Sequence, residues 1–352
     1  MKRGIFLFAL FALSVFSVAS ASSLFTTLTP ISPQAYQKML GVGIDVNWVV
    51  FPKIMEAYKV AHDKGIDIPL LFKQRGFSHV RVRVKDAPLY SVQKDGLTLK
   101  QQLVMVINDC LKAHLIPIIT FTATKFRQNP NSATLNNALN FWKEVATIFK
   151  NYPYVVSYDL IIETSGNISK NNFLLNEFYQ KAVNEIRSID KYRILFLSPN
   201  GTSNPYLLPH LWYPKEDKYI MIEWHFYAAG PSKRNKSKLW TTGTDYEKSL
   251  ILKKIGFAKE WCKSHGLYSW NGAWMPTNFN HAKKPFKMPD GAPMGNYSLQ
   301  EEINFASFVS SSLNKEGIPF AINAGSKFFN YEDFKWYAST SKVIDAILRN
   351  AK

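Results

Sequence analysis

Two glutamates and a histidine stand at the ends of apolar segments, where acid–base chemistry would need them. Glu163 follows the run VVSYDLII, and Glu223 and His225 share one face of IMIEWH if that run is extended. Hydrolysis of a glycosidic bond normally uses two carboxyl groups, one of them protonated. The apolar neighbours Ile161 and Ile162 favour the protonated form of Glu163. We therefore predict Glu163 as the proton donor and Glu223 as the second catalytic carboxylate.

Other charged residues interrupt apolar runs that are typical of buried strands. Arg81 and Arg83 lie in HVRVRV, Asp45 lies in GVGIDV, and Asp159 shares a strand face with Glu163. Charges in such positions must be paired or functional. One interpretation is an internal ion network in which the arginines neutralise Asp159 or Glu223. The other is a substrate site that includes Arg81 and Asp45, with Asp45 as a further substitute carboxylate.

Aromatic residues, which make up 14% of the chain, crowd the segments that follow these runs. Flat rings suit the apolar faces of sugars, and they suit protein cores equally well. We predict that Trp48, Tyr227 and Trp274 bind substrate.

Eight β-rich runs alternate with amphipathic stretches such as 134–150 and 299–314. Strands separated by helices require right-handed crossovers and a parallel sheet. At this length the pattern predicts one (β/α)₈ TIM barrel, whose chemistry would sit at the C-terminal ends of the strands. The alternative is an open doubly wound sheet, although no glycine-rich turn follows the first run. The predicted strands are 41–46, 79–84, 116–121, 155–162, 193–198, 218–226, 267–272 and 318–323.

The N-terminus, MKRGIFLFALFALSVFSVASA, has a basic start, an apolar run and small residues at its end. This pattern predicts a secretory signal peptide over 1–21, with an uncleaved anchor as the alternative. We expect a secreted or periplasmic protein that has no membrane contact after cleavage. Residues 22–352 are predicted to form a single domain, since no linker or repeat divides them.

The net charge is +17, or +15 without Lys2 and Arg3. Such a balance is compatible with binding to an anionic glycan or nucleic acid. The lysines are scattered singly, however, which favours a solvated basic surface. We expect a monomer with no nucleic-acid partner.

The cysteine and histidine patterns indicate neither a metal site nor a cofactor. Cys110 and Cys262 lie far apart without a spacing motif, so one disulfide and two buried thiols are both open. The histidines, His225 included, have no metal-ligand spacing.

Four segments together resemble glycoside hydrolase family 5, the cellulase-like barrels. RGFSHVRVRV is similar to the second-strand signature, with Arg81 as its arginine. VVSYDLIIET resembles the fourth strand, which implies that Glu163 is the acid/base. IEWHFY is similar to the sixth-strand motif, which implies that His225 and Tyr227 bind substrate. YSWNGAWMP resembles the seventh strand, whose Gly-Glu pair supplies the nucleophile in that family.

The chain departs from the family pattern at several catalytic positions. Ile162 and Thr164 replace the asparagine and proline that flank the acid/base, and Ala273 stands at the nucleophile position. The eighth strand, FAINAGSKFF, lacks the usual tryptophan and offers Asn323, which we predict to bind substrate. Without a carboxylate at Ala273, the attacking group would be Glu223 or a water molecule in the vacated space.

The resemblance implies a secreted glycosidase that hydrolyses O-glycosyl bonds of a β-glucan-like polysaccharide or oligosaccharide. Of the two attack modes, direct water attack with inversion is slightly favoured, because alanine leaves room for the water. The alternative function is a carbohydrate-binding barrel that keeps the cleft without turnover.

Overall fold

The computed structural model describes residues 23–225, 240, 242–276, 286–287, 289–294 and 297–351. The predicted signal peptide and Tyr227 lie outside the described residues. No helix in the described part of the chain is long and apolar enough to cross a membrane.

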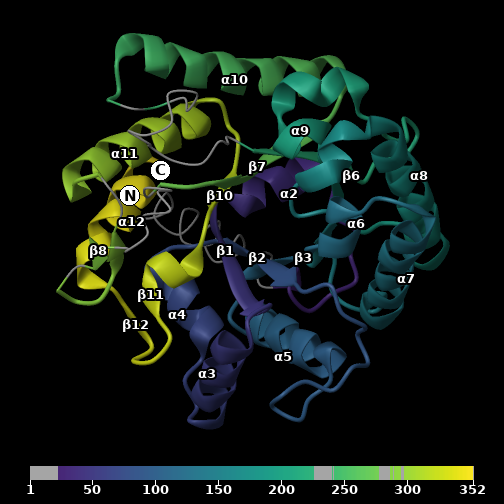
Figure 1. The fold of residues 1–352 in the computed structure, drawn as a ribbon, viewed down its shortest axis with the longest axis horizontal. Coiled ribbons are helices and arrows are strands. Elements are labelled where there is room, and N and C mark those ends of the chain that lie inside the picture. The colour runs from purple at the N-terminus through teal and green to yellow at the C-terminus, as the bar shows by residue number, and fades with distance from the viewer. Residues whose placement is uncertain are drawn as a thin grey trace, which may run out of the picture.

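Eight parallel strands close into a barrel, as predicted (Figure 1). The first and last strands pair from Val42 with Phe320 to Ile44 with Ile322, which excludes an open sheet. Each predicted run overlaps one barrel strand, and β1 and β7 extend beyond the predicted ends at 46 and 272. The strands are β1 (Val42–Val49), β2 (His79–Val84), β3 (Ile116–Phe121), β4 (Ser157–Asp159), β5 (Leu195–Leu197), β6 (Ile220–His225), β7 (Tyr268–Trp274) and β10 (Phe320–Ile322).

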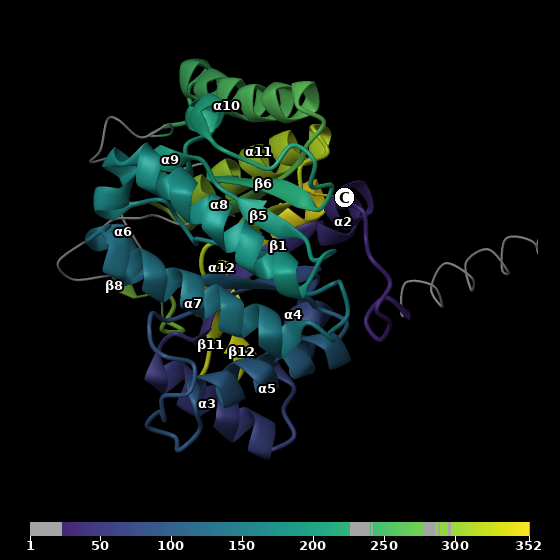
Figure 2. The same cartoon turned by 90° about the vertical axis from the view of Figure 1, so that its right-hand side faces the viewer.

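Helices surround the barrel on its outer side (Figures 1 and 2). Their apolar faces pack on the outward-facing residues of the strands, so the strands are buried on both sides. The α-helices are α2 (Pro33–Leu40), α3 (Pro52–Asp63), α4 (Ile68–Arg75), α5 (Leu99–Lys112), α6 (Thr124–Gln128), α7 (Ser132–Phe149), α8 (Asn172–Ile189), α9 (Asn200–Ser203), α10 (Asp245–Ser264), α11 (Leu299–Lys315) and α12 (Ala338–Asn350). The remaining elements are η1 (Gly166–Lys170), η2 (Pro205–His210), η3 (Gly325–Lys327), β8 (Phe286–Lys287), β9 (Pro293–Met294), β11 (Phe329–Asn330) and β12 (Lys335–Trp336).

The sequence fixes where several long helices begin. At α11 the Ser298 hydroxyl accepts from the Glu301 amide, and the Glu301 carboxylate accepts from the Ser298 amide. Thr244 and Glu247 form the same reciprocal pair at α10. These capping boxes satisfy amides that would otherwise lack partners, and so set the ends of the loops above the barrel.

The N-terminal mouth of the barrel is closed by α2. The Tyr36 hydroxyl donates to the Val155 carbonyl at 2.7 Å, just before β4, and lies 2.8 Å from the Ser157 hydroxyl. The Gln37 amide donates to the Ser269 carbonyl at the start of β7. With this end sealed, a substrate can approach the barrel interior only from the C-terminal ends of the strands, as the fold class requires.

Candidate active site

A buried ion network fills the middle of the barrel. The Arg81 guanidinium donates to both Asp45 oxygens at 2.8 and 2.7 Å, and its Nη1 lies 3.1 Å from both Asp159 and Glu223. Arg83 adds a second contact to Asp45. The internal network considered from the sequence is thus confirmed for Arg81, whereas Arg83 pairs with Asp45 and not with Asp159 or Glu223.

The network sets the protonation of its carboxyl groups. Burial alone would raise the pKa of Asp45, but Arg81 and Arg83 hold it below its ordinary value. For Asp159, burial and the neighbouring charge of Glu223 raise the pKa to about 7, with Arg81 opposing them. One guanidinium therefore compensates several carboxyl groups in a dry interior. Asp45 has no exposed surface, so the prediction that it contacts substrate is wrong.

Glu223 also belongs to this interior layer. Its side chain is fully buried, and its carboxylate contacts both Arg81 and the His225 imidazole above it. A Cβ at Gly272 would stand 2.1 Å from Glu223 Oε1, so the absence of a side chain there makes room for the carboxylate. The prediction that Glu223 is a catalytic carboxylate is wrong, because the parity that aligns it with His225 also places it one layer too deep.

A cleft of about 230 Å³ lies above the network, at the C-terminal ends of the strands. Its walls include Arg83, Arg127, His225 and Asn323, and Arg81 borders it from below. His225 and Asn323, both predicted to bind substrate, do line this cleft, and substrate binding by them stays a prediction. Among the described residues, Glu163 is the one carboxylate that lines it.

Glu163 and His225 form the polar centre of the cleft. The Glu163 side chain is 28% exposed, and its Oε1 lies 3.8 Å from His225 Nδ1. Burial would lower the pKa of His225, but Glu223 and Glu163 raise it to about 9. Burial would raise the pKa of Glu163, but His225, Arg127 and Arg81 bring it below its ordinary value. At neutral pH the proton of this pair therefore resides on the imidazole.

The apolar surroundings predicted to keep Glu163 protonated do not decide its state. Ile161 is fully buried and Ile162 nearly so, as expected. The cations that stabilise the carboxylate come from other segments, His225 from β6 and Arg127 from α6. Neither cation lies near Glu163 in the sequence, so its neighbours along the chain could not predict the lowered pKa.

Ala273 pairs with His225 across β6 and β7 and lines the cleft. The position that holds the nucleophile in the resembled family therefore faces the cleft in this chain, but its side chain is only a methyl group. The Ala273 side chain is too short to reach the centre, and the space above it belongs to the cleft.

The tryptophans predicted to bind sugar are in the core. Trp48 is fully buried, packs on Tyr58 and Phe72, and donates its indole N–H to the Tyr331 hydroxyl at 2.7 Å. Trp274 is buried against Phe305 on α11. Both predictions are wrong for one reason. The ring of each lies between its strand and the covering helices, Trp48 against α3 and α4 and Trp274 against α11, so neither reaches the cleft.

An exposed aromatic ring does stand at the cleft, but the sequence reading missed it. Phe51 lines the cleft and is 51% exposed. It directly precedes Pro52, the first residue of α3, which places it in the loop after β1. That Phe-Pro junction at a strand end is the signal that could have identified it.

Replacing Phe51 with alanine is expected to weaken oligosaccharide binding by about 1–3 kcal/mol, by analogy with ring stacking on flat ligands. Isothermal titration calorimetry with a cello-oligosaccharide would measure the change. Tyr90, which is 57% exposed, provides the matched control. If Tyr90→Ala weakens binding as much as Phe51→Ala does, Phe51 is not a specific platform.

The two cysteines of the chain are not joined in a disulfide. Cys110 and Cys262 are buried free thiols. Burial raises the pKa of Cys262 to about 12, so this thiol is unreactive at neutral pH. No group of three or more metal-ligating side chains occurs in the described part of the chain.

Comparison with known proteins agrees with this architecture. The family model described as cellulase (glycosyl hydrolase family 5) matches residues 55–294. A hyperthermophilic endo-β-1,4-glucanase in complex with substrate superposes with a TM-score of 0.70 and 20% identity, over 90% of this chain and 99% of that one. Thermotoga maritima Cel5A aligns with TM-scores of 0.68, with cellobiose at 20% identity and with mannotriose at 19%, over 89% of this chain and 99% of each. No curated protein sequence matches the chain.

Proposed function

Because the chain belongs to glycosyl hydrolase family 5, the cellulase family, we propose that it hydrolyses O-glycosidic bonds of a β-glucan-like polysaccharide or oligosaccharide. One observation carries the proposal: Glu163 lines the cleft beside His225, at the place where the chain leaves β4. A carboxyl group at this edge can reach a bound glycosidic oxygen. The similar solved structures are described as endoglucanases, which supports a β-glucan as substrate.

The proton for the leaving group comes from the Glu163–His225 pair. At neutral pH this pair holds one transferable proton, which resides on His225. As the glycosidic bond breaks, the leaving oxygen gains basicity and takes a proton through Glu163, while His225 replenishes it. General acid catalysis of this kind contributes about 10²–10⁴-fold to a rate.

The attacking group is water in the space above Ala273. Glu223 is buried, and Ala273 has no nucleophilic atom. The segments 226–239 and 277–285, which follow β6 and β7, contain no Asp or Glu. Water would then attack the oxocarbenium-like centre from the face opposite the leaving group, which inverts the anomeric configuration. The proton that this water releases passes to solvent, and solvent returns one proton to the Glu163–His225 pair for the next turnover. A covalent glycosyl-enzyme on β7 has no residue to form it.

A second candidate function is a carbohydrate-binding barrel without turnover. It is favoured by the same single carboxylate, because glycosidases normally place two carboxyl groups about the bond. The two candidates differ in whether incubation of the purified protein with β-glucan oligosaccharides releases new reducing ends.

Ala273→Glu separates the candidates further. If water uses the space above Ala273, the glutamate side chain is expected to remove most of the existing activity, about 10²-fold or more. Reducing-end release measured before and after the substitution checks this, with Asn304→Asp, which is exposed on α11, as a control for added charge. A gain of activity from a silent parent would identify a binding barrel that lost its nucleophile.

The free energy of unfolding is expected to fall at alkaline pH, because His225 then loses the proton that its carboxylate partners stabilise. Its pKa rises from 6.5 to about 9 on folding, so its contribution is complete below pH 6.5 and is lost as the pH rises through about 9. Urea unfolding at pH 6 and pH 9.5 should give a lower free energy of unfolding at the higher pH. His225→Asn should reduce this difference, and an unchanged difference would mean that another group titrates.

For the whole protein we further propose secretion or export to the periplasm after cleavage of residues 1–21, and a monomeric state. The first follows from the N-terminal sequence pattern.

A further inference from the structure

The positive charges at the cleft differ in whether a carboxylate contacts them directly. Arg81 contacts Asp45, Asp159 and Glu223, and Arg83 contacts Asp45. His225 contacts Glu223. These cations belong to the ion network, and carboxylates of the protein itself contact them.

Arg127 on α6 is different. Its Nε donates to the Thr122 carbonyl at 2.7 Å and its Nη1 donates to the Ser165 hydroxyl at 2.5 Å. Within the described part of the chain no carboxylate oxygen lies within 4.0 Å of its guanidinium, and Nη2 has no hydrogen bond. These two hydrogen bonds fix the orientation of the guanidinium, and its Nη2 group is left to donate to a ligand.

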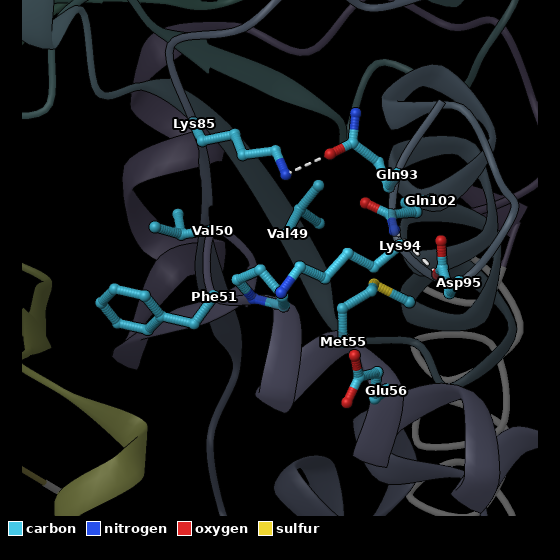
Figure 3. Close-up of a pocket in the computed structure, with 11 residues that line it drawn as sticks. Val49, Val50, Phe51, Met55, Glu56, Lys85, Gln93, Lys94, Asp95 and Gln102 are labelled. Carbon is cyan, nitrogen blue, oxygen red and sulfur yellow. Dashed lines mark hydrogen bonds between the residues drawn. The ribbon is translucent and has the colours of Figure 1, made fainter. Parts of the chain in front are cut away.

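A second cation stands beyond Phe51. There a small hollow, about 30 Å³ in volume, adjoins the cleft and shares Val50 and Phe51 with it. Figure 3 shows the Lys94 side chain extending across this hollow toward Phe51, while Lys85 is directed to Gln93. Lys94 is exposed, and no carboxylate of the described residues lies within 4.0 Å of its ammonium group.

Arg127 and Lys94 thus line two adjoining hollows, and the exposed Phe51 ring belongs to both. A guanidinium with a free fork end matches a carboxylate in two hydrogen bonds, and an ammonium group meets one as a point charge. A neutral glucan offers hydroxyl groups only, so it would bring no carboxylate into contact with either cation, and Arg127 would keep only its longer-range attraction to Glu163 and Asp86. The net charge of +17 would also draw an anionic polymer toward the molecule.

We propose that the glycan bound in this cleft is acidic, a β-linked chain whose sugars carry carboxylates. Arg127 binds the carboxylate of the sugar next to Glu163, and Lys94 binds that of a sugar beyond Phe51. This inference rests on the proposed function in taking the cleft as a glycan site, and it narrows the substrate class from β-glucans in general to uronate-containing ones.

The test compares two ligands that differ in one group. A β-1,4-linked oligomer of glucuronic acid and the cello-oligosaccharide of the same length have the same backbone, with a carboxylate in place of a hydroxymethyl group. Binding is measured by calorimetry in the Glu163→Gln background, so that turnover plays no part, at about 0.15 M salt to screen the distant surface. The acidic oligomer is expected to bind at least about tenfold more tightly, which corresponds to about 1.4 kcal/mol.

Arg127→Gln should remove most of that preference, and Arg127→Lys should retain part of it. Arg349 is the control: it is exposed at the end of α12, where Leu348 packs near Gly76 below β2, on the opposite side of the barrel. Arg349→Gln removes the same charge and should leave the preference intact. Thermal unfolding of each variant confirms that it is folded.

Equal affinity for the two oligomers would overturn the inference. So would a preference that survives Arg127→Gln, or equally tight binding of a single-stranded polynucleotide, because either would trace the effect to the overall charge. The proposed function fails separately, if the wild type releases no reducing ends from either oligomer. Cleavage of the neutral oligomer at the rate of the acidic one would sustain the function and contradict the inference.

Discussion

Glu163→Gln is expected to reduce hydrolysis of an unactivated β-glycan by about 10²–10⁴-fold. The amide cannot pass a proton to the leaving oxygen, although it keeps the shape of the side chain. Aryl glycosides with good leaving groups need little protonation and should lose far less activity. Initial rates on both substrate types measure the difference, and calorimetry should find oligosaccharide affinity nearly unchanged.

The matched control is Glu260→Gln on α10, an exposed glutamate, which should alter neither rate. Equal loss on the activated and unactivated substrates would contradict the proton-donor role. It would instead indicate that Glu163 mainly supports the His225 imidazole at 3.8 Å.

Gly272→Ala is expected to destabilise the protein by about 3–5 kcal/mol. The new methyl group would stand 2.1 Å from Glu223 Oε1 and 2.6 Å from its Cγ, so the glutamate side chain must move. Moving it breaks contacts with Arg81 and His225, and a buried charge that loses its partner costs this much. Chemical denaturation measures the free energy of unfolding.

The control for Gly272→Ala is Gly256→Ala in α10, where a new Cβ meets nothing within 4 Å. Alanine is the better helix former, so that variant should be neutral or slightly more stable. If Gly272→Ala proved as stable as the parent, the tight packing of Glu223 against β7 would be wrong.

The barrel could be predicted because its signal is repeated along the chain. Each buried strand is a short apolar run, each helix an amphipathic one, and their alternation allows few topologies. Charged residues inside such runs also predicted the ion network. Arg81 in β2 can face only the barrel interior or a helix, so its charge needs a partner there. Of its partners, Asp45 lies on the neighbouring strand β1, whereas Asp159 on β4 and Glu223 on β6 reach Arg81 through the barrel interior.

The site was less predictable, for physical reasons. Strand alternation gives the face of a residue but not its depth, so Glu223 shared a face with His225 and still lay below the cleft. Trp48 and Trp274 were assigned by residue type, although each ring packs between its strand and the outer helices. The lowered pKa of Glu163 depends first on His225 and then on Arg127, which only the folded chain brings close to it.

The central claim is that water, and not a residue of β7, attacks the anomeric carbon at this cleft. Proton NMR of the first product formed from a β-linked oligosaccharide tests it most directly, because the two anomers give separate signals before they interconvert. The account predicts that the α-anomer appears first, as inversion requires. Initial release of the β-anomer, or no hydrolysis of neutral and acidic β-glycans alike, would contradict it.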